Sequence, residues 1–470
     1  MARMMKKKNK MGNKYKLSRR SFLKTSALAG TIGMVAGASS TGLLSSCSSD
    51  KQKLNKNALR ERGTYYIPEL PDMADDGKAL RAGVIGCGGR GSGAAFDFLD
   101  SANGVTIVAL GDMFEEKVDV LADKLKQTRD IDISMGKRFV GLDAYKQVVD
   151  SGVDVVIDCT PPFFRPAHFE YIVKHNKHCF IEKPLFVDAV GYRKVMATAK
   201  RAQAKGLTVI TGTIRHHQRS YVESFKKIMD GAIGEIMGGA VYFNIGAIWT
   251  RERQPDWSDL DYMVKDWVNW RWLSGDIIVE QHIHSLDAFI WLSGLKPVSA
   301  LSFGSRLRRK VGDCYDNFST DFTMENGIHL HSMCRQIDGC TNDVSNYIQG
   351  TKGSWTSKGV VGGEVMIKDL EGNVVWRFDE EKEKVEYKQV NPFVLEHVNM
   401  VNCIRKNTPI EQASEAALSN MAAMMARESA YTGQQVSWDE LAASPLDITP
   451  SNWDTGTMDM SSFIAQLPGK

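Results

Sequence analysis

The stretch Leu80-Arg81-Ala82-Gly83-Val84-Ile85-Gly86-Cys87-Gly88-Gly89-Arg90-Gly91 decides the fold of this chain. Its apolar run with a β-branched centre predicts a strand that ends at Gly86 and opens into a Gly-x-Gly-x-x-Gly turn, followed by a helix. In such a turn Gly86 permits the sharp bend, Gly88 lets the backbone approach a pyrophosphate, and Gly91 lets the helix pack closely on the strand. Because the helix N-terminus offers unpaired N–H groups to an anion, we expect a phosphate-bearing ligand here, with Gly89 and Arg90 among its contacts.

An acidic residue follows the next expected strand, where this motif needs one. Residues 105–110 predict that strand and deliver Asp112, 21 positions beyond Gly91. A carboxylate there can bond both ribose hydroxyls of an adenosine and would repel a 2′-phosphate. The alternative is that Asp112 caps the helix expected at 115–126. Given the glycines, we favour NAD as the cofactor over NADP.

The N-terminal segment carries the positive charge of the chain. Residues 1–46 hold ten Lys and Arg and no acid, so the remainder, with 49 basic and 56 acidic residues, has a net charge of −7. That balance does not suggest nucleic acid as a partner. The run Ser18-Arg19-Arg20-Ser21-Phe22-Leu23-Lys24 is a twin-arginine pattern, and a weakly apolar stretch then leads to Leu44-Ser45-Ser46-Cys47, which resembles a bacterial lipobox.

This segment predicts export of the folded protein by the twin-arginine route and a lipid anchor on Cys47. The mature protein is then periplasmic or a membrane-anchored lipoprotein, and an ordinary amphipathic N-terminus is the alternative. Seven further cysteines are scattered without a Cys-x-x-Cys or a zinc-like spacing. They predict buried thiols instead of a disulfide framework, and no metal site.

Length and element order predict two domains. After Asp112, strands and helices alternate as in a doubly wound Rossmann sheet, with a helix at 165–174 and a buried strand at 153–159. From about Gly234, hairpin-like strands predict a C-terminal α+β domain with a large, mostly antiparallel sheet and one long helix at 276–291. Helices at 393–405 and 411–431 should return to the first domain. The expected organisation is a signal (1–47), a tether (48–77), an NAD-binding domain (78–213), a substrate-binding domain (214–435) and a C-terminal extension (436–470).

Two strand ends carry the first candidate chemistry. Thr160 and Pro161 follow the strand at 153–159, and Glu182-Lys183-Pro184 follows the next one. Because ligands bind at the carboxyl ends of parallel strands, Lys183 should project over the nicotinamide end of the site. A lysine there can bond or deprotonate a substrate hydroxyl, whereas the alternative is a solvated lysine before a proline turn.

A second group of candidates lies in the long helix. Glu280, His284 and Asp287 fall at i, i+4 and i+7 and would share one face. Histidine is the usual general base near neutral pH, and a neighbouring carboxylate can orient it. His282 is on another face and is a candidate substrate contact, as is Asp287. Because the two histidines are only two positions apart, they do not predict a metal site.

Further candidates for the substrate wall are rich in aromatic and hydrogen-bonding groups. Sugar rings stack on aromatic faces while their hydroxyls bond to guanidinium and imidazole groups. The segments 215–217 and 267–272 offer such groups, although tryptophan-rich stretches are equally typical of a core. The residues chosen are Arg215, His217, Trp270 and Arg271.

These motifs together resemble the Gfo/Idh/MocA superfamily (glucose–fructose oxidoreductase, inositol dehydrogenase and rhizopine catabolism) over residues 80–435. The resemblance rests on the glycine turn, Thr160-Pro161 with His168 eight residues on, Glu182-Lys183-Pro184 and the phrase Asp230-Gly231-Ala232-Ile233-Gly234-Glu235. It implies that Lys183, Glu280 and His284 are catalytic, and that Thr160, Pro161, His168, Glu182 and Lys183 contact the cofactor. Glu280 stands where the family usually has Asp, which puts that carboxylate one methylene further out.

The resemblance implies hydride transfer between NAD and a secondary hydroxyl carbon of a sugar, glycoside or cyclitol. Outside the cytoplasm no soluble NAD pool exists, so we expect a tightly bound cofactor that is recycled in place. One alternative is an NAD-retaining glycosidase that oxidises, eliminates, hydrates and reduces, which needs no carboxylate pair. A third is a lipoprotein that binds dinucleotide or sugar without catalysis. The resemblance also implies a homo-oligomer formed through an exposed sheet face.

Overall fold

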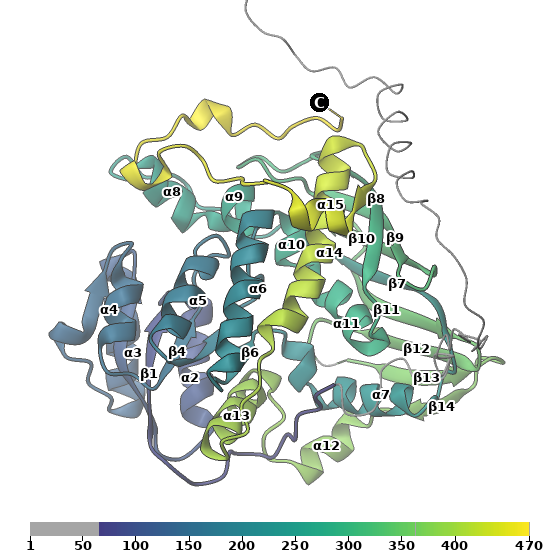
Figure 1. Ribbon diagram of the computed structural model, residues 1–470, viewed down its shortest axis with the longest axis horizontal. Helices are drawn as coiled ribbons and strands as arrows, with labels where there is room; N and C mark the ends of the chain where they lie inside the picture. Colours follow the sequence, from purple (N-terminus) through teal and green to yellow (C-terminus); the bar gives the residue numbers. More distant parts are fainter. Residues whose placement is uncertain (1–64, 362, 470) are drawn as a thin grey trace, which may run out of the picture. The chain divides into compact units, whose positions relative to one another are not determined.

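The computed structural model describes residues 65–361 and 363–469. Its first domain is built on a six-stranded parallel sheet with the order β3-β2-β1-β4-β5-β6. Figure 1 labels β1, β4 and β6 of this sheet. The order reverses between β1 and β4, and this is where doubly wound sheets bind dinucleotides. The strands are β1 (Leu80–Ile85), β2 (Val105–Asp112), β3 (Arg138–Val140), β4 (Val155–Asp158), β5 (His178–Ile181) and β6 (Val209–Thr211).

Helices on both faces bury the apolar strands of this sheet. All four residues of β4 are buried, as the continuous apolar run at 153–159 predicts. α5 has the bounds that the sequence predicts, with Pro166 in its first turn. The helices are α2 (Gly89–Asp100), α3 (Glu115–Arg129), α4 (Ala144–Asp150), α5 (Arg165–Lys174) and α6 (Ala189–Ala204).

The C-terminal domain contains a nine-stranded sheet with the order β14-β13-β12-β11-β7-β10-β9-β8-β15. Its pairs are antiparallel except β7 with β10, so the sheet is mostly antiparallel, as predicted. The strands are β7 (Ile236–Ile245), β8 (Pro297–Ser305), β9 (Asn317–Met324), β10 (His329–Gln336), β11 (Asp343–Gly350), β12 (Gly353–Lys358), β13 (Val365–Asp369), β14 (Val374–Arg377) and β15 (Val436–Ser437).

The prediction of one long helix at 276–291 is wrong, because the structure has two shorter helices there. α10 (Ile277–Glu280) ends before Gln281, and α11 (Ile283–Ser293) begins two residues later. In a continuous helix the Glu280 carbonyl would accept the His284 N–H, but it accepts from Lys183 Nζ, and the His284 N–H donates to the Gln281 carbonyl. The interruption separates Glu280 from His284, so the two do not share one helical face.

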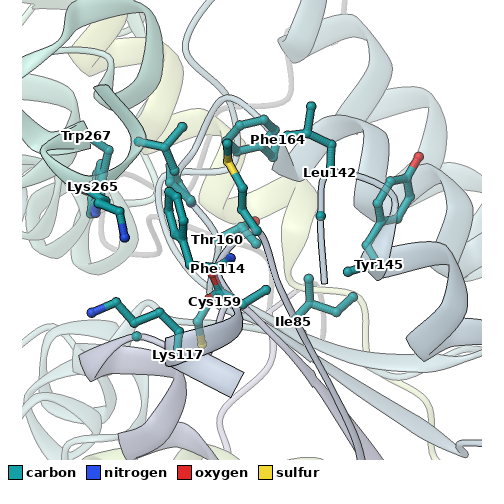
Figure 2. A pocket seen from close by; sticks show the side chains of 18 of the residues that line it. Ile85, Phe114, Lys117, Leu142, Tyr145, Cys159, Thr160, Phe164, Lys265 and Trp267 are labelled. Carbon is teal, nitrogen blue, oxygen red and sulfur yellow. The ribbon is translucent and has the colours of Figure 1, made fainter. Parts of the chain in front are cut away.

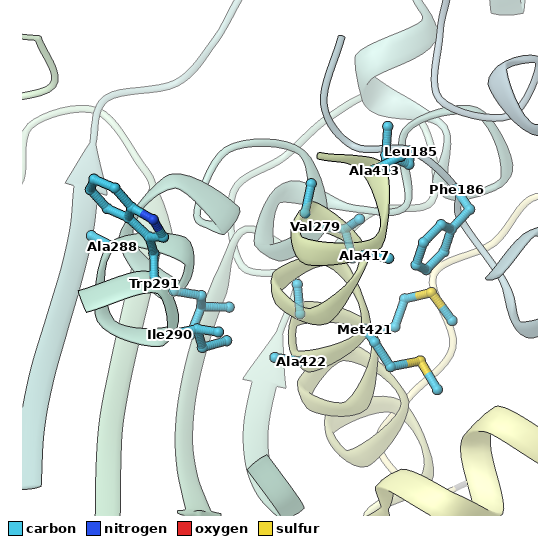
Figure 3. Close-up of a cluster of buried hydrophobic side chains, with 14 of the residues drawn as sticks. Leu185, Phe186, Val279, Ala288, Ile290, Trp291, Ala413, Ala417, Met421 and Ala422 are labelled. Atoms are coloured by element: carbon cyan, nitrogen blue, oxygen red, sulfur yellow. The ribbon is translucent and has the colours of Figure 1, made fainter. Parts of the chain in front are cut away.

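α14 joins the two domains. α13 (Pro392–Arg405) contacts α2, and α14 (Ala413–Thr432) contacts α6, α11 and β8. Figure 3 shows α14 between Phe186 of the first domain and Trp291 of α11. The small side chains of Ala417 and Ala422 let α14 pack closely against both domains. The remaining helices are α7 (Arg219–Met229), α8 (Asp259–Lys265), α9 (Arg271–Ser274), α12 (Glu380–Glu386) and α15 (Trp438–Ala443), with short 3-10 turns at Met135–Lys137 (η1), Ile214–His217 (η2), Trp267–Asn269 (η3), Trp453–Thr455 (η4) and Met460–Ser462 (η5).

The described end of the expected tether belongs to the folded body. Tyr65 packs on Phe225, and Tyr66 donates to Asn399 Oδ1 over 2.6 Å. These contacts arise because residues 65–77 contain apolar and aromatic side chains that can be buried. The twin-arginine pattern, the lipobox with Cys47 and tether residues 48–64 lie outside the described residues.

The seven described cysteines are free, and five of them are buried. Cys340 is exposed, against the expectation of buried thiols, because it lies in the polar turn between β10 and β11. In the described part of the chain, every helix is too short or too polar to cross a bilayer. Over the same residues, no cluster of three or more His, Cys, Asp and Glu has the arrangement of a metal site.

Candidate functional site

The glycine turn after β1 has the geometry of a pyrophosphate cradle. Gly86 has φ +83°, a conformation that disfavours other residues. A Cβ on Gly91 would lie 1.7 Å from the carbonyl oxygen of Gly86, whereas Gly88 and Gly89 have no atom within 4 Å of that position. The backbone is therefore tightly packed where Gly91 meets Gly86, and it is open at Gly88 and Gly89, at the start of α2.

A cavity of about 430 Å³ lies over this turn. It is lined by Gly86, Gly88 and Gly89, by Asp112 at the end of β2, and by Thr160, Pro161 and His168 after β4. Figure 2 shows Ile85, Cys159 and Thr160 between Lys265 on one side and Tyr145 on the other. The elements that the sequence predicts to hold a dinucleotide thus surround one cavity, and its open glycines leave room for the backbone approach that NAD needs.

Asp112, which the motif predicts to bind the adenosine ribose, lines this cavity at the end of β2. Its Oδ2 accepts the Cys87 N–H over 2.7 Å, and its Oδ1 accepts the Phe114 N–H over 3.0 Å. Burial raises its pKa above the usual range. The N-cap of α3 is Phe114, so the alternative in which Asp112 caps that helix is wrong.

His168 is held in place by the end of β4. Its Nδ1 lies 3.2 Å from Asp158 Oδ2 and 3.3 Å from Thr160 Oγ1, and Thr160 also donates to Asp158 over 2.6 Å. The ring of Tyr145 stacks on His168 with centroids 4.2 Å apart. These contacts fix the imidazole at the wall of the cavity. Sequence reasoning missed Asp158 and Tyr145, which act through His168.

Arg90 ties the glycine turn to the strand end that carries Lys183. Its guanidinium forms ion pairs with Glu182, Asp97 and Glu396. Burial opposes ionisation of Glu182, but the cations of Arg90 and Lys183 outweigh it and lower the pKa of that carboxyl. Glu182 therefore serves as an anionic anchor, and its Oε2 accepts the Lys183 backbone N–H over 3.0 Å.

The backbone around Lys183 is fixed by both domains. Arg165 Nη1 donates to the Pro184 carbonyl over 2.6 Å, and Asn420 Oδ1 of α14 accepts the Leu185 N–H over 2.7 Å. Asp158 and Ile181 are paired in register on β4 and β5. Thr160 and Lys183 each follow one of these partners by two residues, so they lie at the same edge of the sheet.

Lys183 and Glu280 meet between the two domains. Lys183 Nζ donates to Glu280 Oε1 over 3.0 Å and to the Glu280 carbonyl over 2.5 Å. Both side chains are about nine-tenths buried, with 11% and 9% of their surfaces exposed. Glu280 Oε2 is buried and has no hydrogen-bond partner among the described residues. The carboxylate therefore orients Lys183, where the sequence predicts that it orients His284.

His284 lies beside this pair as a neutral base. Burial, and then the positive charges of Lys183 and Arg215, lower its pKa well below the usual range. Arg215 Nη1 donates to the His284 carbonyl over 2.6 Å and so fixes the first turn of α11. The arrangement offers a held ammonium donor next to an uncharged imidazole, which is suited to moving a proton at a hydroxyl group.

Three predicted substrate contacts lie instead in buried hydrogen-bond networks. Asp287 accepts from Ser419 over 2.8 Å, and its Oδ2 lies 2.9 Å from His216 Nε2. His282 Nε2 lies 2.6 Å from Ser332 Oγ on β10. His217 Nε2 accepts from Asn399 over 3.1 Å, and burial lowers its pKa to about 3. Each of these side chains links elements that are far apart in sequence.

The other predicted substrate contacts divide between the site and a separate core. Arg215 is buried beside His284, and its Nη2 has no hydrogen-bond partner among the described residues. Trp270 packs edge-on against Phe463, with centroids 5.8 Å apart. The Arg271 guanidinium lies over the Tyr431 ring, 4.7 Å from its centre. Of these three residues, Arg215 contacts His284, through the His284 carbonyl.

Sequence reasoning missed most of one wall of the cavity, of which it had named only Trp267, within the segment 267–272. It comes from the segment between β7 and α9, which is rich in aromatic and cationic side chains but has no clear periodicity. The signal that could have found it is the clustering of Trp and Lys/Arg before a helix. The residues that line the cavity are Trp249, Arg251, Trp257, Val264, Lys265 and Trp267.

Two models of one family match this chain. Residues 80–211 match the model described as an oxidoreductase family with an NAD-binding Rossmann fold, and residues 225–356 match that of the GFO/IDH/MocA C-terminal domain. Together they cover more than half of the chain: the first spans the strands of the parallel sheet, and the second spans β7 to β11 and the start of β12 in the nine-stranded sheet.

Similar proteins include two inositol dehydrogenases. The inositol 2-dehydrogenase of Rhizobium meliloti (strain 1021) is 26% identical over 243 residues, or 51% of this chain and 64% of that protein. The scyllo-inositol 2-dehydrogenase (NAD(+)) of Bacillus subtilis (strain 168) is 23% identical over 281 residues, which are 58% of this chain and 72% of that protein. The chain thus spans less than two thirds of the first relative.

Among solved structures, the aldose-aldose oxidoreductase of Caulobacter crescentus has a similar fold. It superposes with a TM-score of 0.61 at 18% identity, covering 77% of this chain and 100% of that chain. At this identity the likeness is one of fold.

Proposed function

Because the chain belongs to the GFO/IDH/MocA oxidoreductase family, we propose that it transfers a hydride between NAD and a secondary hydroxyl carbon of a sugar, glycoside or cyclitol. The observation that carries this proposal is the Lys183–Glu280 ion pair beside neutral His284, at the sheet edge where the glycine turn and Asp112 line a cavity. The names of the inositol dehydrogenase relatives support the substrate class.

The residues of the chain would divide the work as follows. NAD, when bound, accepts the hydride from the carbinol carbon or returns it. His284, which is neutral at physiological pH, takes the proton of the substrate hydroxyl. Lys183 donates a hydrogen bond to the same oxygen and stabilises its developing negative charge. Glu280 positions Lys183, and Arg215 positions His284 through its carbonyl.

We also propose that NAD stays bound and is recycled in place. The twin-arginine pattern and the lipobox at Cys47 support export to a compartment without soluble NAD. A Cys47→Ser variant should leave the membrane fraction, and a variant that remains there contradicts the lipid anchor.

We further propose that the chain forms a homo-oligomer. The C-terminal sheet exposes Leu301, Phe303 and Tyr347, which supports this proposal. A monomer mass by light scattering contradicts it.

The experiment uses protein purified without added nucleotide. Mass spectrometry of the released small molecules should find NAD, and a panel of cyclitols and glycosides should change the near-ultraviolet absorbance of the bound cofactor. Lasting reduction of the cofactor indicates a dehydrogenase, whereas release of free sugar without net reduction indicates the NAD-retaining glycosidase. Protein that binds NAD but responds to no member of the panel contradicts hydride transfer and favours a binding lipoprotein.

A further inference from the structure

A segment of the C-terminal domain closes over one half of the dinucleotide groove. We call residues 246–267, between β7 and α9, the cap segment. It brings three indole rings and two cations to the cavity, and Figure 2 shows Lys265 and Trp267 across the cavity from Tyr145. The opposite wall is formed by the first domain, so a ligand there would be enclosed between the two domains.

The contacts of Lys265 show which half of the groove the cap segment covers. Its ammonium lies 3.7 Å from the centre of the Phe114 ring and forms an ion pair with Glu116. Both residues closely follow Asp112, the residue that the motif places at the adenosine ribose. Because Lys265 is held to the first domain by an aromatic face and by an opposite charge, the cap segment is tied across the groove at its adenosine end.

The C-terminal extension holds the cap segment and the neighbouring wall in place. The Met458 N–H donates to Asp259 Oδ2, at the start of α8, over 3.1 Å. Trp453 packs edge-on against Phe163 and Phe164, with centroids 5.0 Å and 5.8 Å apart. Phe164 itself lines the cavity, and Figure 1 shows the extension passing α8 and α9. The extension therefore contacts the cap segment and the loop that follows β4.

We propose that the cap segment and the C-terminal extension form a clamp that retains the adenosine half of NAD and makes its exchange slow, an inference that rests on the proposed function. An adenine ring offers flat faces to indole rings, and the pyrophosphate is an anion suited to Lys265 and Arg251. For NAD to leave, the cap segment must lift, which breaks the contacts of Lys265 and the packing around Trp453. The clamp keeps the cofactor bound from one turnover to the next.

The test measures exchange of bound NAD. The full chain, purified with NAD bound, is mixed with an excess of NAD carrying heavy nitrogen in its adenine, and mass spectrometry follows the replacement. Lys265→Met and Trp453→Ala should each exchange at least about tenfold faster than the unmodified chain. Lys265→Arg retains the cation and should exchange slowly, as should Trp376→Ala, which alters a half-buried tryptophan of β14 at the far edge of the second sheet.

Thermal unfolding of each variant shows whether its fold is intact. If Trp453→Ala does not fold, Lys265→Met decides alone, because that change leaves the apolar packing of the extension in place. Equal exchange rates for Lys265→Met and the unmodified chain overturn the clamp and leave the proposed function standing. A chain that binds no dinucleotide at all overturns both.

Discussion

Gly88 and Gly91 lie three residues apart in one turn, but their surroundings differ. The position of a Cβ on Gly88 faces open space in the cavity, whereas on Gly91 it would overlap the Gly86 carbonyl. The first glycine therefore leaves room for a ligand, and the second leaves room for the chain itself. Substitution should separate these two requirements.

We expect Gly88→Ala to fold with a free energy of unfolding within about 0.5 kcal/mol of the unmodified chain and to bind NAD at least about tenfold more weakly. Gly91→Ala should lose more than about 2 kcal/mol of stability, because a backbone shift is unavoidable. Urea unfolding and calorimetric NAD titration of cofactor-free protein measure both effects. Gly136→Ala, where a Cβ also meets open space, is the control. Unchanged NAD affinity in Gly88→Ala would contradict the cradle.

The sequence alone predicts which residues gather at the site better than it predicts their partners. Lys183, Glu280 and His284 could be named from motif and spacing. The Lys183–Glu280 ion pair could not, because it depends on the break between α10 and α11. Likewise, helical spacing predicts that Asp287 contacts the substrate. In the structure its carboxylate contacts His216 of η2 and Ser419 of α14, which are distant in sequence.

At the scale of elements, Asp287 connects three of them. It lies on α11, and its carboxylate contacts η2 through His216 and α14 through Ser419. α14 in turn holds the strand end that carries Lys183 through Asn420. Asp287 is thus a structural link behind the site, and its loss should affect folding before it affects substrate binding.

Asp287→Ala should lower the free energy of unfolding by about 3 kcal/mol, because it removes a buried hydrogen-bonded carboxylate. Asp287→Asn, which preserves the shape, should lose less. Urea unfolding measures the loss, and Asp321→Ala on the exposed face of β9 is a matched control. A stable Asp287→Ala protein with a raised KM for substrate would instead support the predicted substrate contact.

The elements differ in how well sequence patterns predict them. The first domain follows its predicted order because strands such as β4 are continuous apolar runs buried on both faces. By contrast, β11 and β12 contain few apolar residues among serine, threonine and asparagine, so their sequences do not have the apolar alternation that predicts a strand. The cap segment was missed because tertiary contacts, and not periodicity, bring it over the groove.

At the scale of the whole molecule, buried histidines couple folding to pH. Burial lowers the pKa of His217 and of His282 to about 3. In the unfolded chain each would titrate near about 6.5. As pH falls below that value, these histidines bind protons in the unfolded chain but stay neutral in the folded chain. Protonation therefore stabilises the unfolded chain, and the free energy of unfolding falls.

Between about pH 7.5 and about pH 5, His217 alone should cost up to about 2 kcal/mol of unfolding free energy. Comparing urea unfolding of the unmodified chain with His217→Gln isolates this contribution, because the variant keeps an acceptor for Asn399 but cannot titrate. His329→Gln, at an exposed position, controls for a general charge effect. Parallel pH profiles for the unmodified chain and His217→Gln would show that this histidine is not coupled to folding.

The most direct measurement of hydride transfer follows the isotope. The NAD-loaded chain is incubated with cyclitols and glycosides that carry deuterium on their ring carbons, and the cofactor is analysed by mass spectrometry. With at least one compound, the reduced nicotinamide should become one deuteron heavier, and Lys183→Ala should lower the labelling rate by about 10²–10⁴-fold. If no compound labels the cofactor of a chain that binds NAD even when the reaction is stopped during turnover, before the hydride is returned, or if Lys183→Ala labels it at the same rate, then the Lys183–Glu280–His284 arrangement does not carry out the proposed reaction.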